Sequence, residues 1–167
     1  ENFYDYITVA AALIIYGIAF ILIERGHNSK PSRIENTDDI TYRDALLIGI
    51  FQVLAVIPGT SRSGSTILGA MLLGLSRPAA AEFTFFLAIP TMAGASLLKA
   101  AKFVFYGGTM TGIDAALIIA ASIAAFAVSY LVIRFLMNFV KRHTFSSFGV
   151  YRIVLGAVVL AYYLLTR

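Results

Sequence analysis

The residues best suited to chemistry in this chain lie at positions 58–66, in the segment Pro-Gly-Thr-Ser-Arg-Ser-Gly-Ser-Thr. A guanidinium group matches the planar oxygens of a phosphate, hydroxyl groups add neutral donors, and glycines let backbone N–H groups approach a ligand. Because an arginine is costly at membrane depth, one between apolar runs usually faces a cavity, a partner or a ligand. The segment therefore predicts an anion-binding turn. The alternative is a polar kink in which Arg62 pairs with a distant carboxylate.

The composition of the chain places this turn in a membrane protein. The chain has 167 residues, of which 59% are hydrophobic and 13% are charged, and its mean hydropathy is +0.84. A soluble domain of this length is far less apolar. The formal net charge is +4, but the lysines and arginines are scattered among the predicted loops, so no nucleic-acid partner is expected. The lack of cysteine excludes disulfides and thiolate metal sites.

Four apolar segments are predicted to cross the membrane as helices, because each approaches the length of about 20 residues that a spanning helix needs. They cover residues 7–23, 79–98, 115–133 and 150–165. The predicted fold class is therefore all-α integral membrane, with about four transmembrane helices. The polar stretch 24–44 is expected to be a solvated loop, in which Glu35, Asp38 and Asp39 form a solvated surface rather than a metal cluster.

Two shorter apolar legs, residues 45–57 and 67–75, flank the polar turn and have the length of re-entrant segments. Pro58 is expected to end the first leg, and residues 64–66 to open the second as a helix whose N–H groups point at the turn. A re-entrant helical hairpin over about residues 45–75 follows. The alternative is one kinked helix of about 45 Å, which is too long for the membrane core without a large tilt.

The loop charges predict an orientation. If the hairpin enters and leaves on one side, that side receives most of the lysines and arginines of the loops, which favours it as the cytoplasmic side. Both termini would then lie outside, and the hairpin would dip in from the cytoplasm.

Four stretches resemble one protein family. The signature PGTSRSGSTI follows the apolar GIFQVLAVI and precedes GLSRPAAAEFTFFLAIP, and the chain nears its end with FGVYRIVLGAVVL. Together they resemble the bacterial undecaprenyl-diphosphate phosphatases, the bacitracin-resistance family. The resemblance implies a multi-pass enzyme of the bacterial inner (plasma) membrane. It would hydrolyse undecaprenyl diphosphate to undecaprenyl phosphate and phosphate, and so recycle the lipid carrier of peptidoglycan synthesis.

The resemblance and the chemistry of the side chains together suggest roles for the turn. We expect Arg62 to bind the diphosphate and to offset charge on the transferred phosphoryl group. Ser61 and Thr66 are expected to donate hydrogen bonds to phosphate oxygens. The remaining binding residues of the turn are Gly59, Thr60, Ser63 and Gly64.

Two further side chains near the turn have open interpretations. Ser61 is an alternative nucleophile, ranked below its binding role because a hydroxyl needs a nearby base and none is visible in the sequence. Glu82 either orients Arg62 or holds a divalent ion, or it is a helix-end carboxylate that reaches interfacial water. Arg152, beside Tyr151, is interpreted as an anchor of the last helix that extends toward the membrane surface.

The family's first signature is absent from this sequence. That signature has a Glu-x-x-x-Glu pair followed by a Ser- and Gly-rich turn that ends in His, whereas here Glu24 precedes Asn28 and Glu35 precedes Asp39. The chain is therefore expected to form one membrane domain, residues 1–167, that is the C-terminal portion of a longer enzyme and half of an inverted repeat. The resemblance also implies Mg²⁺ or Ca²⁺, for which no metal ligand is identified in this chain.

The expected partners are an isoprenoid diphosphate lipid, membrane lipid, the missing N-terminal repeat or a companion chain, and a second copy in a homodimer. The rival function is that of a lipid transporter or flippase half, since inverted repeats with broken helices around an anion site also occur in transporters.

Overall fold

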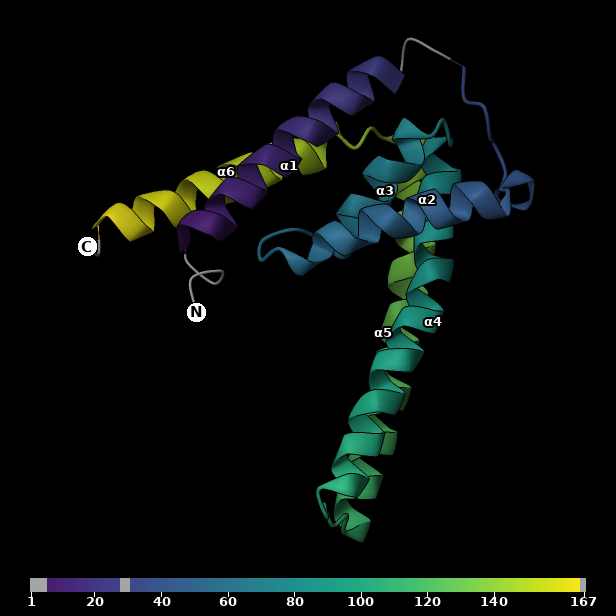
Figure 1. The fold of residues 1–167 in the computed structure, drawn as a ribbon, viewed down its shortest axis with the longest axis vertical. Coiled ribbons are helices and arrows are strands. Elements are labelled where there is room, and N and C mark those ends of the chain that lie inside the picture. Colours follow the sequence, from purple (N-terminus) through teal and green to yellow (C-terminus); the bar gives the residue numbers. More distant parts are fainter. Residues whose placement is uncertain (1–5, 28–30, 166–167) are drawn as a thin grey trace.

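The computed structural model describes residues 6–27 and 31–165, and this part of the chain is helical without a β-strand, as predicted (Figure 1). The α-helices are α1 (Tyr6–His27), α2 (Tyr42–Val53), α3 (Arg62–Leu72), α4 (Arg77–Phe105), α5 (Gly112–Arg142) and α6 (Ser146–Leu165). Two short 3-10 helices complete the described elements, η2 (Thr37–Asp39) and η3 (Leu54–Val56). Within these described ranges, one isolated parallel bridge joins Ile34 to Leu75.

Four of these helices are long and apolar enough to cross a membrane, namely α1, α4, α5 and α6. Each contains one of the predicted apolar segments, so the four predicted helices are confirmed as helices of spanning length. The helices extend beyond the apolar cores because polar residues at their ends continue or cap them. The hydroxyl of Thr111, for example, accepts a hydrogen bond from the backbone N–H of Asp114, and the Asp114 carboxylate accepts one from the backbone N–H of Thr111.

Helices α1 and α6 lie side by side although they are at opposite ends of the described chain (Figure 1). Glycines allow this close approach. A Cβ atom added to Gly149 would lie 2.7 Å from the carbonyl oxygen of Gly17, and one added to Gly156 would lie 3.0 Å from the carbonyl oxygen of Ala10. Small residues of this kind let the backbones of two membrane helices come into contact.

The polar turn joins α2 to α3 in a helical hairpin, so the alternative of one kinked helix over residues 45–75 is wrong. Helix α3 begins at Arg62, earlier than the predicted start at residues 64–66, because Ser61 caps it. The Ser61 hydroxyl accepts a hydrogen bond from the backbone N–H of Gly64 at 3.1 Å. Most of the signature therefore lies in the first turns of a helix.

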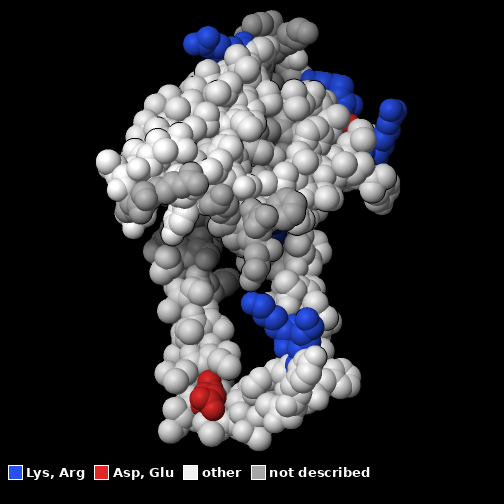
Figure 2. Space-filling view, turned by 60° about the vertical axis from the view of Figure 1, so that its left-hand side comes forward, with Lys and Arg blue, Asp and Glu red and all other residues white. Residues whose placement is uncertain are grey.

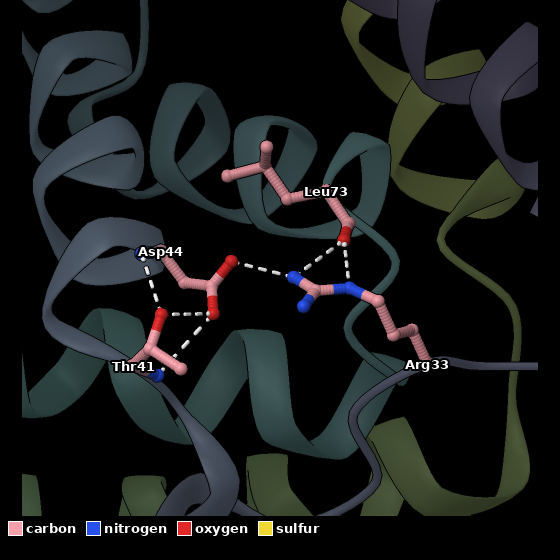
Figure 3. A network of polar contacts seen from close by, with 4 residues as sticks. All are labelled: Arg33, Thr41, Asp44 and Leu73. Carbon is pink, nitrogen blue, oxygen red and sulfur yellow. Dashed lines mark hydrogen bonds and ion pairs between the residues drawn. The ribbon is translucent and has the colours of Figure 1, made fainter.

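A polar network closes the hairpin at the end opposite to the turn (Figure 3). The Thr41 hydroxyl donates to the carboxylate of Asp44 at 2.7 Å, and Arg33 donates to the other carboxylate oxygen. Arg33 also donates through Nε and Nη2 to the carbonyl oxygen of Leu73, both at 3.2 Å. The loop before α2, the start of α2 and the end of α3 are thereby tied together.

The predicted solvated loop is more structured at its two ends than expected. Glu24 belongs to α1 and is 1% exposed, and Asp44 is 6% exposed in the network described above. Ile34 is also buried. Between these points Glu35, Asp38 and Asp39 are exposed, in agreement with the predicted solvated surface.

The helices α4 and α5 form a long hairpin that extends away from the rest of the molecule (Figure 1). Figure 2 shows an opening between the two limbs of this hairpin. Most residues of α5 from 112 to 135 are exposed, and they are mainly apolar. The buried core instead surrounds α3 and takes residues from α1, α2, α4 and the end of α5.

Candidate functional site

The turn between α2 and α3 is held in shape by its own backbone and by α1. The Thr60 N–H donates to the carbonyl oxygen of Ile57 at 3.1 Å. Gly59 has φ +86°, which favours glycine, and a Cβ atom at this position would lie 2.7 Å from the carbonyl oxygen of Val9. The glycine therefore serves both the backbone conformation and the close approach of the turn to α1.

The hydroxyls of the turn divide into two groups. Ser61 and Ser63 lie at the start of α3, with their Oγ atoms 3.2 Å apart, and both line a cavity. Ser65 and Thr66 are each 1% exposed. We therefore expect Ser61 and Ser63, rather than Ser65 and Thr66, to reach a ligand without a rearrangement.

The buried hydroxyls make contacts within the protein. Ser65 Oγ lies 3.1 Å from the Tyr16 hydroxyl and 3.1 Å from the carbonyl oxygen of Ser61. The Thr66 hydroxyl lies within hydrogen-bond distance of backbone carbonyls of α3 and accepts a hydrogen bond from Thr84 of α4 at 3.0 Å. The structure thus places Thr66 against α4, where it joins the two helices.

Arg62 is the first residue of α3, and its side chain is partly exposed. Among the described residues its guanidinium group makes no hydrogen bond or ion pair. The described part of the chain therefore does not adopt the alternative, a polar kink in which Arg62 pairs with a distant carboxylate. Glu82, on α4, is exposed, and within the same ranges it makes no ion pair with Arg62.

Arg152 of α6 reaches the turn, and this is the residue that sequence reasoning placed wrongly. Its Nη2 donates to the carbonyl oxygen of Gly59 at 2.8 Å, and its guanidinium carbon lies 5.7 Å from the centre of the Tyr16 ring. A side chain extended toward the membrane surface would make neither contact. Sequence does contain a signal, because Gly149 and Gly156 lie three residues before and four after Arg152 and so share its helix face.

The turn opens onto a cavity of about 290 Å³. Its polar wall contains Ser61, Ser63 and Arg152, and the other walls are mainly apolar and aromatic side chains of α1, α3, α4, α5 and α6. Among the described residues, two buried side-chain atoms here have no hydrogen-bond partner, Oγ1 of Thr60 in the turn and Nε of Arg152 on α6. A cavity with a cationic end and an apolar body suits an amphiphile whose headgroup is an anion.

The described residues at this site do not fit a divalent cation. Mg²⁺ and Ca²⁺ take oxygen ligands, among them carboxylates, whereas the polar wall offers hydroxyls and a guanidinium group. No group of three or more His, Asp or Glu side chains that could hold a metal occurs in residues 6–27 and 31–165. Glu24 is paired with Arg77.

The family model described as "Bacitracin resistance protein BacA" matches residues 1–158. The chain belongs to this family. It is 56% identical over 167 residues to a protein of Lachnoclostridium phytofermentans named "Undecaprenyl-diphosphatase", with 100% of the chain and 60% of that relative covered. A protein of Enterococcus faecalis with the same name is 51% identical over 163 residues, with 98% and 59% covered.

A protein of Clostridium acetobutylicum named "Undecaprenyl-diphosphatase 1" is 54% identical over 164 residues, with 98% of the chain and 59% of that relative covered. The chain thus spans about 60% of the length of the curated relatives that it matches. The resemblance found in the signature residues is confirmed at the level of the family.

Proposed function

We propose that the full-length protein hydrolyses undecaprenyl diphosphate to undecaprenyl phosphate and inorganic phosphate. The observation that carries the proposal is the polar turn, which borders an apolar cavity through Ser61 and Ser63 and whose Arg62 makes no hydrogen bond or ion pair within the described chain. The relatives named undecaprenyl-diphosphatase support the choice of substrate. Release of phosphate from this carrier lipid would return it to peptidoglycan synthesis.

In this proposal Arg62 binds the phosphoryl group that is transferred. Its guanidinium group is free to form two parallel hydrogen bonds with phosphate oxygens, and its charge offsets the negative charge of the transition state. Ser61 and Ser63 add neutral donors on the cavity side, while Gly59 and Gly64 permit the turn. Thr60 Oγ1 is buried without a protein partner, so a ligand oxygen can supply one.

We assign Ser61 to binding rather than to nucleophilic attack. Its Oγ accepts from the Gly64 N–H and lies next to Ser63, and no described carboxylate or imidazole contacts it. A serine nucleophile requires such a base. Thr66 takes a positioning role in this scheme, because its hydroxyl already lies among backbone carbonyls of α3 and accepts from Thr84.

The acid or base that manages protons belongs, in this proposal, to the part of the relatives that the present chain does not span. The resemblance implies a Glu-x-x-x-Glu pair and a histidine there, supplied by a preceding repeat or a companion chain. We place any Mg²⁺ or Ca²⁺ with those carboxylates as well. Glu82 remains a candidate member of this acidic set because its exposed side chain is available to an incoming partner.

We further propose that the α2–α3 hairpin is re-entrant. Helix α2 has 12 residues and helix α3 has 11, so each is about 17–18 Å long and too short for a hydrocarbon core of about 30 Å. The hairpin would dip from the cytoplasmic side of the bacterial inner membrane and meet the hairpin of an inverted repeat near the midplane. The exposed apolar residues of α5 are available to lipid, to that repeat or to a second copy.

The test is a comparison of the full-length protein with the 167-residue chain. Each is purified in detergent and given undecaprenyl diphosphate with Mg²⁺ or Ca²⁺, and released phosphate is measured. We expect phosphate from the full-length protein and none from the chain alone. Movement of the lipid across vesicles without phosphate release would instead support the transporter function. Phosphate release by the chain alone would contradict the assignment of the proton-handling groups and make Glu82 the leading carboxylate.

A further inference from the structure

Arg152 is a cation in the first half of α6, and it has no carboxylate partner among the described residues, where the ion pairs are Arg33 with Asp44 and Glu24 with Arg77. Its neighbours are neutral. They are the Gly59 carbonyl oxygen, 2.8 Å from Nη2, and the face of the Tyr16 ring. Cation–π contacts and single carbonyls stabilise a cation only partly.

The guanidinium group of Arg152 is incompletely satisfied. Its Nε is buried without a hydrogen-bond partner, and a buried donor left in that state is costly. Its Nη1 lies against the first turn of α3, since a Cβ atom at Gly64 would be 3.1 Å from it. An anion at this point would satisfy the unpaired donor and compensate the charge.

Arg152 and Arg62 occupy different positions around the turn. Arg152 lines the cavity together with Ser61 and Ser63, whereas Arg62 is absent from the cavity wall. Beyond Arg152 the wall is apolar, with Phe148 and Leu155 on the same helix. An amphiphile with its chain in the cavity must therefore place the lipid-proximal part of its headgroup beside Arg152.

We propose that Arg152 binds the phosphate that stays on the lipid, while Arg62 binds the terminal phosphate that leaves. The proposal rests on the proposed function and adds to it the division of the diphosphate between two arginines from different helices. A lipid monophosphate, which keeps only the first phosphate, should then depend on Arg152. Inorganic phosphate should depend on Arg62.

The competing explanation is that Arg152 only holds the turn through Gly59. A purely structural role would deform the whole turn when Arg152 is replaced, so it would weaken the binding of both products alike. The proposed role would weaken one product selectively. The two explanations therefore differ in a pattern of affinities rather than in the size of an activity loss.

The experiment uses the full-length protein with the substitutions Arg152→Gln, Arg152→Lys and Arg62→Lys. Arg134→Gln is the matched control, because Arg134 is an exposed arginine of α5 away from the cavity. The measured quantities are the inhibition constants of an isoprenyl monophosphate and of inorganic phosphate, with the melting temperature of each variant. Arg152→Lys keeps the positive charge, so it takes the place of Arg152→Gln in the comparison if Arg152→Gln does not fold.

For the Arg152 variants we expect the inhibition constant of the isoprenyl monophosphate to rise about tenfold or more, with that of inorganic phosphate changed by less than about threefold. Arg62→Lys should give the reverse pattern. Equal weakening of both inhibitors, or unchanged affinity for the monophosphate in a folded Arg152 variant, would overturn the proposal. Absence of phosphate release by the unsubstituted full-length protein would instead overturn the proposed function.

Discussion

The carboxylate of Glu24 forms an ion pair with the guanidinium group of Arg77, 53 residues further along the chain. Glu24 is 1% exposed and also accepts a hydrogen bond from the backbone N–H of Phe145 at 3.3 Å. One buried carboxylate thus joins the end of α1, the start of α4 and the connection between α5 and α6. These segments all contribute residues to the buried core around α3.

Loss of both partners of this ion pair should destabilise the fold by less than the sum of the two single losses. Glu24→Gln removes the charge that compensates Arg77, and removal of one member of a buried pair costs about 3–5 kcal/mol. Glu24→Gln combined with Arg77→Met should cost less than the sum of the two single substitutions. Thermal unfolding in detergent measures all three variants, and additive losses would show that the pair contributes no coupling.

The Asp44 network should make the hairpin sensitive to acid. Hydrogen bonds from the Thr41 hydroxyl and then from Arg33 hold the pKa of Asp44 below its usual value of 3.8. The charged form therefore stabilises the folded state above that value, and this contribution is lost as the pH falls through the lower pKa of the folded protein. Asp44→Asn should cost roughly 1 kcal/mol at neutral pH, with the difference from the natural protein fading in acid.

The control for the Asp44 prediction is Asp38→Asn, since Asp38 is exposed in η2. Melting temperatures measured from pH 7 downward give both differences. A stability deficit of Asp44→Asn that stays constant to the lowest pH would contradict the assigned ionisation.

Gly59→Ala should be far more harmful than a comparable change at Gly107. Both glycines have positive φ, +86° and +73°, so alanine is strained at either position by about 1–2 kcal/mol. Only at Gly59 would the new Cβ also collide with α1, 2.7 Å from the Val9 carbonyl oxygen, while no described atom lies within 4 Å at Gly107. Equal melting temperatures of the two variants would show that the contact with α1 is unimportant.

Arg62→Lys should reduce turnover by the full-length protein while leaving its stability unchanged. Lysine keeps the positive charge but loses the planar fork, so we expect at least a tenfold fall, which corresponds to about 1.4 kcal/mol. Stability should persist because Arg62 makes no hydrogen bond or ion pair with the described part of the chain. Arg43→Lys, at an exposed position of α2, is the control, and near-normal hydrolysis by Arg62→Lys would contradict the binding role.

Single cysteines should report which hydroxyls of the turn meet water. The sequence has no cysteine, so each introduced thiol is the only one. Ser63→Cys should react with small charged thiol reagents because Ser63 is exposed, and Ser65→Cys should react slowly because Ser65 is 1% exposed beside Tyr16. A rapid reaction at Ser65 would indicate a more open site than the structure has.

The parts of this fold that depend on local sequence could be predicted, and those that depend on pairing between distant helices could not. The four long helices follow from apolar length, and the hairpin turn follows from Pro58 and the polar run after it. Glu24 was expected at the edge of a loop because charge next to an apolar segment usually marks its end. Its burial is set by Arg77, whose position relative to α1 is a property of the tertiary structure.

The same limit explains the candidate site. Arg62, Ser61 and Ser63 could be identified because their types and spacing lie within one short segment. The contacts of Arg152 and Tyr16 with that segment require α1 and α6 to pack together, and hydrophobic periodicity does not say which helices meet. The predicted start of α3 at residues 64–66 is too late because the Ser61 cap lets the helix begin at Arg62.

The pairing of α1 with α6 also has a consequence for biosynthesis. The first and last described helices are neighbours, and Gly59 receives a hydrogen bond from Arg152, 93 residues away. During translation the α2–α3 hairpin is therefore synthesised long before α6. Until α6 is made, the hairpin lacks its contact with Arg152. A premature stop within α6 would remove a wall of the site rather than a dispensable tail, so quality-control proteases should recognise such truncated chains as unfinished.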